Sequence, residues 1–423
     1  MSGEDRVIII GGGPAGSTMG CYLSKAGVPN TIIESAVHPR PHVGESLVTS
    51  TTRMFDEIGF LPTMESEGFV KKFGAAWHPP QKTGTFGMEF REFPQPGVHQ
   101  DHSYHVDRAK FDMLLLKHAE KLGSTVIQGT PVNEVRFDGD RAVGVAATVA
   151  GQKVNIPARA VIDASGRKTL LGRHLDLKEK DPVFDQFAVH AWFENVDKGE
   201  AADEDYIHIY FLPTKRGWAW QIPITETVTS IGVVAERSVF KEMGGSVEAW
   251  FESHLESAPD FARAMKNARR VNDFKREADY SYAMTRFVGN GWMLVGDAAR
   301  FVDPIFSSGV SVAMSSAKFA SQTLVEGLAR GDISEAALTP YETKLRGGVN
   351  VWYEFISLYY RLLPLFTVFI NSKKHRQGVL ELLQGEVFDR EDVPVLDAMR
   401  KYIETVEKSD SHVFKAYLDD VAA

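Results

Sequence analysis

The sequence predicts an α/β protein in which a Rossmann-like dinucleotide-binding domain is joined to an antiparallel β-sheet domain and a helical C-terminal region. Three observations indicate this fold class. A continuous β-branched run at Val7-Ile8-Ile9-Ile10 enters a glycine-rich turn, as a buried parallel strand does before a phosphate-binding loop. Alternating apolar segments between residues 186 and 274 are typical of a sheet with one buried face. Helical periodicity dominates residues 331–423.

The glycine-rich turn has the spacing of a dinucleotide-binding loop. Gly11 permits the tight turn after the strand, Gly13 lets a pyrophosphate approach the backbone, and Gly16 lets the next helix pack against the strand. A helix from about Ala15 to Ala26 then directs its positive end at the phosphates. Because a strand precedes the turn and a helix follows it, the context favours a dinucleotide site over a chance glycine pattern.

An acidic residue completes this unit. A second expected strand, residues 30–33, is followed by Glu34, eighteen residues past Gly16, where a carboxylate accepts hydrogen bonds from a ribose. The residues expected to hold the dinucleotide in this part of the chain are Gly11, Gly13, Pro14, Ala15, Gly16 and Glu34.

A second cofactor signal lies far downstream. A short apolar strand ends in Gly296-Asp297, and Asp303-Pro304 precedes a helix rich in serine and alanine. A glycine loop early and a Gly-Asp pair late resembles the order in flavoprotein monooxygenases and their relatives, and the resemblance implies FAD. Arg108 matches an arginine that lies near the flavin in that superfamily. As an alternative, it is a surface arginine that opens a helix running to Leu122.

These anchors divide the chain into three parts. The FAD-binding domain is expected to be discontinuous and to comprise residues 1–75, 104–185 and 275–330. The substrate-side sheet domain is assigned residues 76–103 and 186–274, and the helical region residues 331–423. In that region Thr339-Pro340-Tyr341-Glu342 predicts a helix start, because it joins a capping box to a proline at the first helical position.

Composition limits the classes of function. Lys and Arg number 47 against 56 Asp and Glu, a net charge of −9, and no basic block interleaves with aromatic residues as nucleic-acid binding would favour. The single cysteine, Cys21, excludes an intrachain disulfide and a multi-cysteine metal site. The longest apolar stretch, Leu362 to Ile370, is short and is broken by Pro364. No signal-peptide pattern is seen, so we expect a cytoplasmic protein with no metal and no membrane or nucleic-acid partner.

A hexapeptide near the middle of the chain contains two tryptophans two residues apart. In an extended segment Trp218, Trp220 and Ile222 share one face and form an apolar wall, and Pro223 ends the strand because it lacks an N–H. Such a wall would separate a reactive cofactor from a substrate. The alternative is an ordinary buried aromatic strand.

Together these motifs resemble flavin-dependent halogenases. The resemblance covers nearly the whole chain and rests on the glycine loop, Gly44-Glu45-Ser46-Leu47, Val70-Lys71-Lys72-Phe73-Gly74-Ala75, the tryptophan hexapeptide and Asp303 to Gly309. Within the family, the chain is most similar to pyoluteorin-type members that act on a pyrrole tethered to a carrier protein. The cofactor contacts that this resemblance adds are Glu45, Ser46, Arg108, Gly296, Asp297 and Pro304.

The resemblance also implies a chemistry. Reduced FAD from a separate flavin reductase, oxygen, and chloride or bromide yield hypohalous acid, which a lysine relays to the substrate. That lysine is Lys72, with Lys71 as the fallback, and the halide is held at Ser308 and Gly309. A lysine suits this role because its pKa falls readily on burial. The tunnel barrier is assigned to Trp218, Trp220, Ile222 and Pro223.

One departure bears on the substrate. Tryptophan halogenases carry a glutamate where this chain has Phe306. The residue that accepts the ring proton is therefore not identified, and an electron-rich pyrrole or phenol is favoured over tryptophan as the substrate. The implied partner is a carrier protein bearing pyrrolyl-phosphopantetheine. It would dock at a basic patch, either residues 266–270 or residues 373–376. A homodimer is left open.

The sequence also permits other functions. A flavin-dependent aromatic hydroxylase or a halogenase of a free phenol would share most of these motifs. A hydroxylase would usually carry Asp-Gly where this chain has Asp163-Ala164. A reductase of isoprenoid double bonds would lack the context of Lys72. A non-catalytic flavin-binding partner is the remaining class, because fold alone does not fix function.

Overall fold

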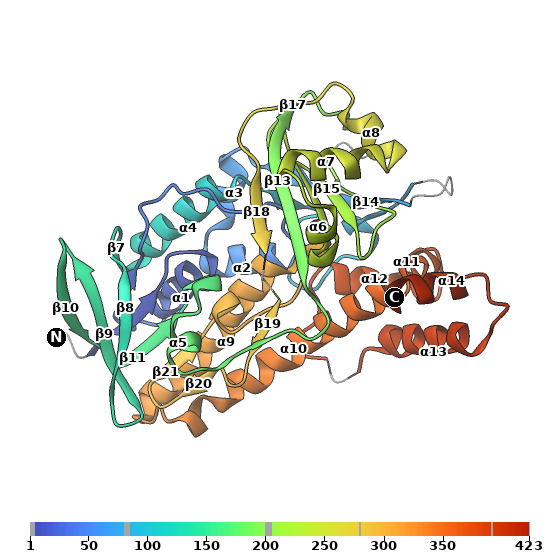
Figure 1. The fold of residues 1–423 in the computed structure, drawn as a ribbon. Coiled ribbons are helices and arrows are strands. Elements are labelled where there is room, and N and C mark those ends of the chain that lie inside the picture. The colour runs from blue at the N-terminus through green and yellow to red at the C-terminus, as the bar shows by residue number, and fades with distance from the viewer. Residues whose placement is uncertain (1–4, 80–84, 199–204, 279–280, 391, 423) are drawn as a thin grey trace.

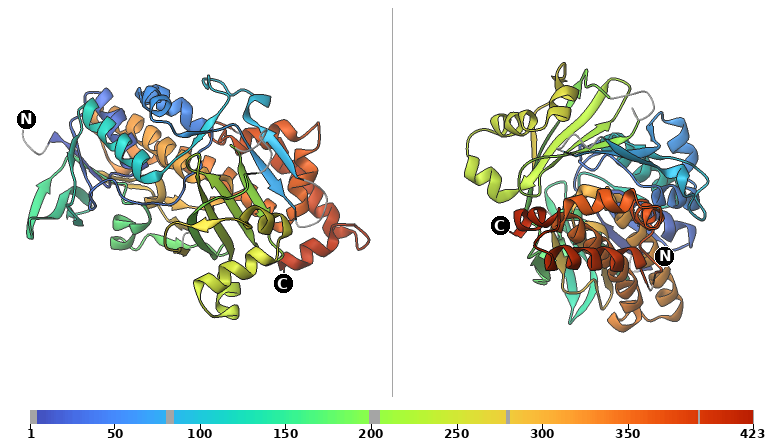
Figure 2. Two further views of the ribbon diagram at one scale, coloured as in Figure 1. Left: turned by 90° about the horizontal axis from the view of Figure 1, so that it is seen from above. Right: turned by 90° about the vertical axis from the view of Figure 1, so that its right-hand side faces the viewer.

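The computed structural model describes residues 5–79, 85–198, 205–278, 281–390 and 392–422, and it confirms the predicted fold class. Two large sheets lie side by side and a group of helices closes one end of the molecule (Figure 1). That helical end is opposite the N-terminus in Figure 1 and in the left view of Figure 2.

The first sheet has six strands in the order β20-β21-β11-β1-β2-β7, all parallel except β20. Its strands are β1 (Val7–Ile10), β2 (Asn30–Ile33), β7 (Thr125–Ile127), β11 (Ala160–Asp163), β20 (Val288–Gly289) and β21 (Trp292–Leu294). Helix α1 (Pro14–Lys25) packs against both α4 (Arg108–Leu122) and α9 (Ser308–Arg330). A three-stranded sheet of β8 (Val132–Asp138), β9 (Arg141–Val149) and β10 (Gln152–Pro157) adjoins β11.

The turn between β1 and α1 requires glycine at the helix start. A Cβ at Gly16 would lie 1.9 Å from the carbonyl oxygen of Gly11, so any side chain there would push the helix off the strand. The strand itself is fully buried, because each residue of Val7–Ile10 is 5% exposed or less. These two features hold the start of α1 at the carboxyl edge of the sheet, where the parallel strands end.

The second sheet has eight strands and is antiparallel except for one pair. Its order is β17-β13-β16-β15-β14-β4-β5, with β18 also paired to β13, and β14 runs parallel to β4. Its strands are β4 (Gly74–His78), β5 (Phe86–Glu89), β13 (Gln186–Glu194), β14 (Ile207–Phe211), β15 (Trp218–Pro223), β16 (Val228–Glu236), β17 (Arg269–Arg270) and β18 (Lys275–Ala278). Helices α6 (Arg237–Met243), α7 (Val247–Glu256) and α8 (Pro259–Met265) lie on its outer side (Figure 1).

Two smaller pairings link the large sheets. Strand β3 (Val70–Lys72) pairs antiparallel with β6 (Ser103–His105), and β19 (Tyr282–Met284) lies between β12 (Lys178–Lys180) and β22 (Arg300–Phe301). The short helices α2 (Ser50–Ile58), α3 (Leu61–Ser66) and α5 (Leu170–His174) connect these segments.

The C-terminal region consists of α10 (Glu335–Arg361), α11 (Leu363–Ile370), α12 (Arg376–Leu383), α13 (Pro394–Lys408) and α14 (Lys415–Ala422). The predicted helix start at Thr339-Pro340 is wrong, because α10 begins one turn earlier and Pro340 lies inside it. The Ser334 hydroxyl accepts a hydrogen bond from the Ala337 N–H at 3.3 Å and so caps the helix. Pro340 follows close enough to this end for the helix to continue through it.

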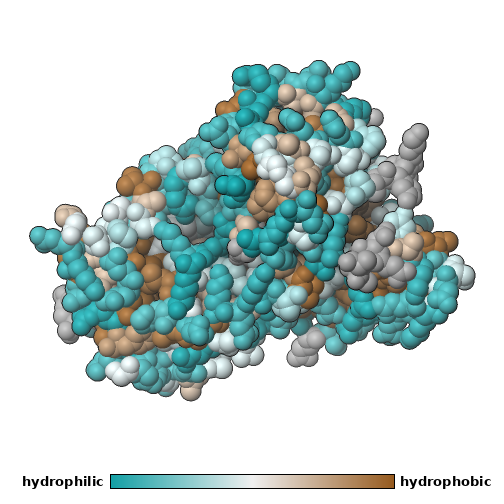
Figure 3. All heavy atoms as spheres, in the orientation of Figure 1, coloured by the Kyte–Doolittle hydropathy of each residue, from teal (hydrophilic) through white to brown (hydrophobic). Residues whose placement is uncertain are grey.

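The described residues contain no single helix long and apolar enough to cross a membrane. Helices α10 and α11 satisfy the length and composition test only as a pair, and they are bent by 109° relative to each other. The face of the molecule in Figure 3 is mainly hydrophilic, with apolar residues in small separate patches.

Candidate active site

A cavity of about 510 Å³ opens between the two large sheets. Its volume is in the range of sites that bind small molecules and cofactors. The residues of its wall that the sequence singled out are Gly11, Gly13, Pro14, Ala15, Glu34, Glu45, Ser46, Arg108, Trp218, Trp220, Ile222, Asp297, Pro304 and Gly309. The singled-out residues outside this wall are Gly16, Lys72, Pro223, Gly296 and Ser308.

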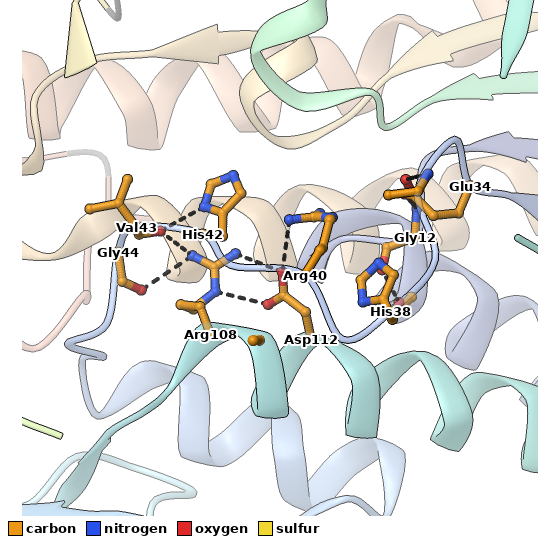
Figure 4. Close-up of polar contacts among 12 residues, drawn as sticks. Gly12, Glu34, His38, Arg40, His42, Val43, Gly44, Arg108 and Asp112 are labelled. Carbon is orange, nitrogen blue, oxygen red and sulfur yellow. Dashed lines mark hydrogen bonds and ion pairs between the residues drawn. The ribbon is translucent and has the colours of Figure 1, made fainter. Parts of the chain in front are cut away.

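One end of the cavity is formed by the turn after β1. The Glu34 carboxylate accepts hydrogen bonds from the backbone N–H groups of Gly12 and Ala36, both at 2.7 Å (Figure 4). Burial opposes ionisation of Glu34, but these hydrogen bonds and the charge of Arg40 outweigh it and hold the pKa of Glu34 below its usual range. A charged carboxylate is therefore fixed where a ribose hydroxyl can donate to it.

Arg108 lies in the wall of this cavity, and the surface-arginine alternative is wrong, since its exposure is 4%. Its guanidinium donates to both carboxylate oxygens of Asp112, at 2.8 and 3.1 Å, and to the carbonyl oxygen of Val43 at 2.7 Å. Figure 4 shows Arg108 between the Val43-Gly44 segment and Asp112. These contacts fix the loop that precedes Glu45.

Arg40 and His42 also line the cavity, and sequence reasoning did not identify them. The Arg40 guanidinium approaches Asp112 at 3.7 Å, and one of its nitrogens lies 3.5 Å from the place where a Cβ of Gly13 would be. The Nδ1 atom of His42 lies 2.7 Å from the Val43 carbonyl oxygen, and its side chain is exposed at the rim of the cavity. The run Pro39-Arg40-Pro41-His42 is an irregular loop, so no periodicity marks it.

The tryptophan strand forms the opposite wall. Trp218, Trp220 and Ile222 all face the cavity, whereas Ala219 belongs to the core under helices α6 to α8. Strand β15 ends at Pro223, although it lies between β14 and β16 in the middle of the sheet. The Trp220 N–H donates to the Ser230 hydroxyl at 3.1 Å, and the Trp218 N–H donates to the Tyr360 hydroxyl at 2.8 Å.

The segment Gly44–Leu47 crosses from this cavity to Lys72. Glu45 and Ser46 line the cavity, and the backbone of the segment pairs with β6 through Val106 N–H to Glu45 at 2.7 Å and Leu47 N–H to Tyr104 at 3.0 Å. One Glu45 oxygen accepts from the Trp192 N–H at 2.7 Å. Burial raises the pKa of Glu45, which is 2% exposed.

Lys72 is a buried amine at the far end of that segment. Its Nζ donates to the Leu47 carbonyl oxygen at 3.0 Å and lies 5.4 Å from the centre of the Phe90 ring. Burial lowers the pKa of Lys72 to about 7. Lys71 points to the other face of β3, where it is exposed and pairs with Glu65 at 3.1 Å. Of the two lysines, only Lys72 has the environment of a reactive amine.

The turn at residues 303–309 borders both the main cavity and a second, small one of about 20 Å³. Ser308 and Gly309 open α9, so their N–H groups lie at the positive end of a 23-residue helix. One Asp303 oxygen accepts from the Ile305 N–H at 2.9 Å and the Tyr360 hydroxyl at 3.2 Å. Burial raises the pKa of Asp303 to about 7.

Phe306 lies within a cluster of aromatic side chains from the C-terminal helices. Its ring is 4.7 Å from that of Phe355, 5.2 Å from that of Tyr359 and 5.6 Å from that of Phe366. Phe366 in turn lies 4.9 Å from Trp77 of β4. An apolar region therefore surrounds the position of the missing glutamate.

The cavity fits FAD on three observations. Gly13 leaves its backbone accessible below the Arg40 guanidinium, Glu34 provides a charged oxygen at the ribose position, and the tryptophan strand provides an apolar aromatic wall. Asp297 lies at the wall between these ends, and burial raises its pKa to about 6. When bound, FAD would supply the redox chemistry.

These features define a flavoprotein of the FAD-dependent monooxygenase-like class. A family model described as "Tryptophan halogenase" matches residues 6–95 and 88–364, so the chain belongs to this family, as predicted. It is a flavin-dependent halogenase, and the aromatic hydroxylase alternative is not favoured.

Relatives cover almost the full chain. A 1H-pyrrole-2-carbonyl-(peptidyl-carrier protein) chlorinase from Pseudomonas fluorescens is 47% identical, over 100% of this chain and 98% of its own length. The corresponding brominase from Pseudoalteromonas luteoviolacea is 29% identical, over 95% and 97%. The solved structure of the flavin-dependent brominase Bmp2 superposes with a TM-score of 0.86 at 29% identity, covering 95% of this chain and 98% of that one.

Proposed function

We propose that this halogenase modifies a pyrrolyl group attached to the phosphopantetheine arm of a carrier protein, with FAD reduced by a separate reductase and with chloride or bromide as the halogen source. The observation that carries the proposal is the position of Lys72. Its amine is buried beyond the flavin cavity and is bonded to Leu47, the last residue of the segment whose Glu45 and Ser46 line that cavity. The named activities of the two carrier-protein halogenases support the substrate.

The residues divide the reaction among separate places. Trp218 and Trp220 would form the barrier between the bound flavin and the substrate. Hydrogen bonds from both indole N–H groups hold these side chains in place. The N–H groups of Ser308 and Gly309 would bind the halide at the start of α9. Lys72 would hold the hypohalous acid by donating a hydrogen bond from its amine. With a pKa of about 7, this amine is partly neutral and partly charged near neutral pH.

The aromatic surroundings of Phe306 support an electron-rich ring as the substrate. A carboxylate at this position would be desolvated by Phe355, Tyr359 and Phe366, whereas phenylalanine packs against them without cost. A pyrrole needs less activation than an indole ring, so it tolerates the loss of that acid.

The direct test is mass spectrometry of a pyrrolyl carrier protein after incubation with this protein, a flavin reductase, NADH, oxygen and either halide. The mass should rise by the replacement of hydrogen with halogen. An unchanged mass with both chloride and bromide would reject the proposed activity.

Lys72→Ala provides a sharper test of the relay. The variant should lose halogenation by at least about a hundredfold, as expected for a group that acts at the reacting atoms, while reduced FAD is reoxidised at the normal rate. Lys71→Ala is the matched control and should keep full halogenation, because Lys71 lies on the opposite face of β3. Halogenation retained in Lys72→Ala and lost in Lys71→Ala would transfer the role to Lys71.

A further inference from the structure

The face of β6 that carries Lys72's neighbours is lined with polar side chains. Strands β3 and β6 pair with Lys72 opposite Ser103 and Val70 opposite His105. Ser46 bridges to His105 on the other edge of β6. Because residues directly opposite in neighbouring strands point to the same side, Ser46, His105, Ser103 and Lys72 share one face. We call these four residues the β6 polar track.

The track connects the two halves of the site. Ser46 lines the flavin cavity, and Lys72 lies at the other end. All four side chains are buried, with exposures of 4% or less, and the Oγ atoms of Ser46 and Ser103 and the Nδ1 atom of His105 have no hydrogen-bond partner among the described residues. Buried polar atoms normally have a partner, so three unpartnered atoms in one row leave hydrogen-bonding capacity that a small polar molecule would satisfy.

The protonation of His105 follows from its one contact. Its Nε2 lies 3.1 Å from the carbonyl oxygen of Asp205, which can only accept, so Nε2 carries the hydrogen. Nδ1 therefore presents a lone pair. Burial and the charge of Lys72 keep the pKa of His105 well below its usual value, so the ring stays neutral. His208 is the other titratable group that acts on it.

We propose that His105 Nδ1 is the hydrogen-bond acceptor that, together with the Lys72 amine, binds hypohalous acid on its way from the flavin cavity. The acid donates its O–H to Nδ1, and its oxygen accepts from Lys72 Nζ. No bond is made or broken in this step. The inference rests on the proposed relay function of Lys72.

His105→Leu tests the proposal because it removes the acceptor at similar volume. Three quantities are measured: the rate of flavin reoxidation, the halogenated carrier formed per flavin reoxidised, and the halogenation of an added 1,3-diketone scavenger that reacts with free hypohalous acid. In His105→Leu we expect the product per flavin to fall about tenfold, the loss of one good hydrogen bond. Scavenger halogenation should rise, and reoxidation should be unchanged.

His105→Asn is the matched conservative variant, because its side-chain oxygen can accept at the position of Nδ1, and it should recover most of the product per flavin. Product and scavenger yields of His105→Leu within twofold of wild type would overturn the proposal. If His105→Leu does not bind FAD, His105→Phe, which keeps a flat ring but has no acceptor atom, carries the test, and unchanged yields in it are equally contradictory. Absence of halogenated carrier with the wild-type protein would count against the proposed substrate, whereas the scavenger comparison would still decide the role of His105.

Discussion

At the scale of single residues, two adjacent lysines have opposite environments. Strand alternation places Lys71 in solvent beside Glu65 and Lys72 in the interior, with an exposure of 3%. The only protein acceptor within hydrogen-bond distance of Lys72 Nζ among the described residues is the Leu47 carbonyl. Burial of this amine lowers its affinity for protons, and that effect must appear in the stability of the protein.

We expect Lys72→Met to change the pH dependence of stability. The pKa of Lys72 is lowered from 10.5 in the unfolded chain to about 7 by burial, so between these values the unfolded chain binds the extra proton. The free energy of unfolding of the wild type should therefore rise with pH relative to Lys72→Met, by about 1 kcal/mol per pH unit. Urea unfolding at pH 7.5, 8.5 and 9.5 measures this.

The difference in the free energy of unfolding between the wild type and Lys72→Met has a defined sign. Lys72→Met should be the more stable protein near pH 7, and its advantage should shrink toward pH 9.5. Lys71→Met, an exposed control on the same strand, should follow the wild-type curve. Parallel curves for wild type and Lys72→Met would show that the Lys72 amine is solvated.

At the scale of elements, the tryptophan wall depends on a glycine in the neighbouring strand. Gly232 of β16 is the cross-strand partner of Trp220, and a Cβ at Gly232 would lie 2.2 Å from the Trp220 ring. The indole thus lies flat over the glycine, and its N–H reaches Ser230 two residues away. The position of the Trp220 ring in the wall therefore depends on both strands, β15 and β16, and not on β15 alone.

Gly232→Val should therefore displace the Trp220 ring toward the cavity. We expect FAD affinity to fall about tenfold or more and stability to fall by about 1 to 3 kcal/mol, the usual cost of overpacking. Flavin fluorescence titration and urea unfolding measure the two effects. Gly347→Ala is the control, because a Cβ there would meet nothing within 4 Å on the exposed side of α10. It should leave FAD affinity unchanged and stabilise the helix by up to about 1 kcal/mol.

How far the sequence predicts each element depends on the range of the contacts that form it. The alternation of Trp218, Trp220 and Ile222 is local, so one shared face could be predicted and is observed. The predicted start of α10 was wrong because Pro340 is a strong local signal for a first helical position. The residue that caps the helix is Ser334, about one turn earlier. Choosing Lys72 over Lys71 needed family resemblance, since the charge pattern alone does not distinguish them.

Contacts between distant segments could not be predicted. Glu45 meets Trp192 across 147 residues, and Trp218 meets Tyr360 across 142. Arg40 lies over the phosphate loop from a segment with no periodic pattern. These contacts depend on how the sheets pack together, which no local spacing encodes.

At the scale of the whole molecule, the two basic patches suggested for carrier docking differ in how they are neutralised. In the first, Arg269 pairs with Glu194 and Arg270 lies 3.7 Å from Glu248. In the second, Lys373 and Lys374 are exposed and make no ion pair among the described residues. On a chain of net charge −9, the second patch is the stronger candidate for an acidic partner.

The second patch is also linked by contacts to the buried amine of Lys72. Arg376, two residues past Lys374, forms an ion pair with Glu92 at 2.7 Å. Glu92 ends the short helical turn Phe90–Glu92. The ring centre of Phe90, at the start of this turn, lies 5.4 Å from Lys72 Nζ. Lys373 and Lys374 therefore lie on a segment that contacts the surroundings of Lys72 through Arg376, Glu92 and Phe90.

We predict that Lys373→Glu/Lys374→Glu raises the KM for the pyrrolyl carrier protein about tenfold at low salt, because it replaces two attractive charges with repulsive ones. The effect should shrink at about 0.5 M salt, where the charges are screened. The kcat and the turnover of a small pyrrolyl thioester without a carrier should stay at wild-type values, which separates docking from chemistry. Lys266→Glu/Arg270→Glu is the matched control and should change KM less than twofold. A larger effect in the control pair would contradict this prediction and would place the carrier at the α8 end of the substrate-side sheet instead.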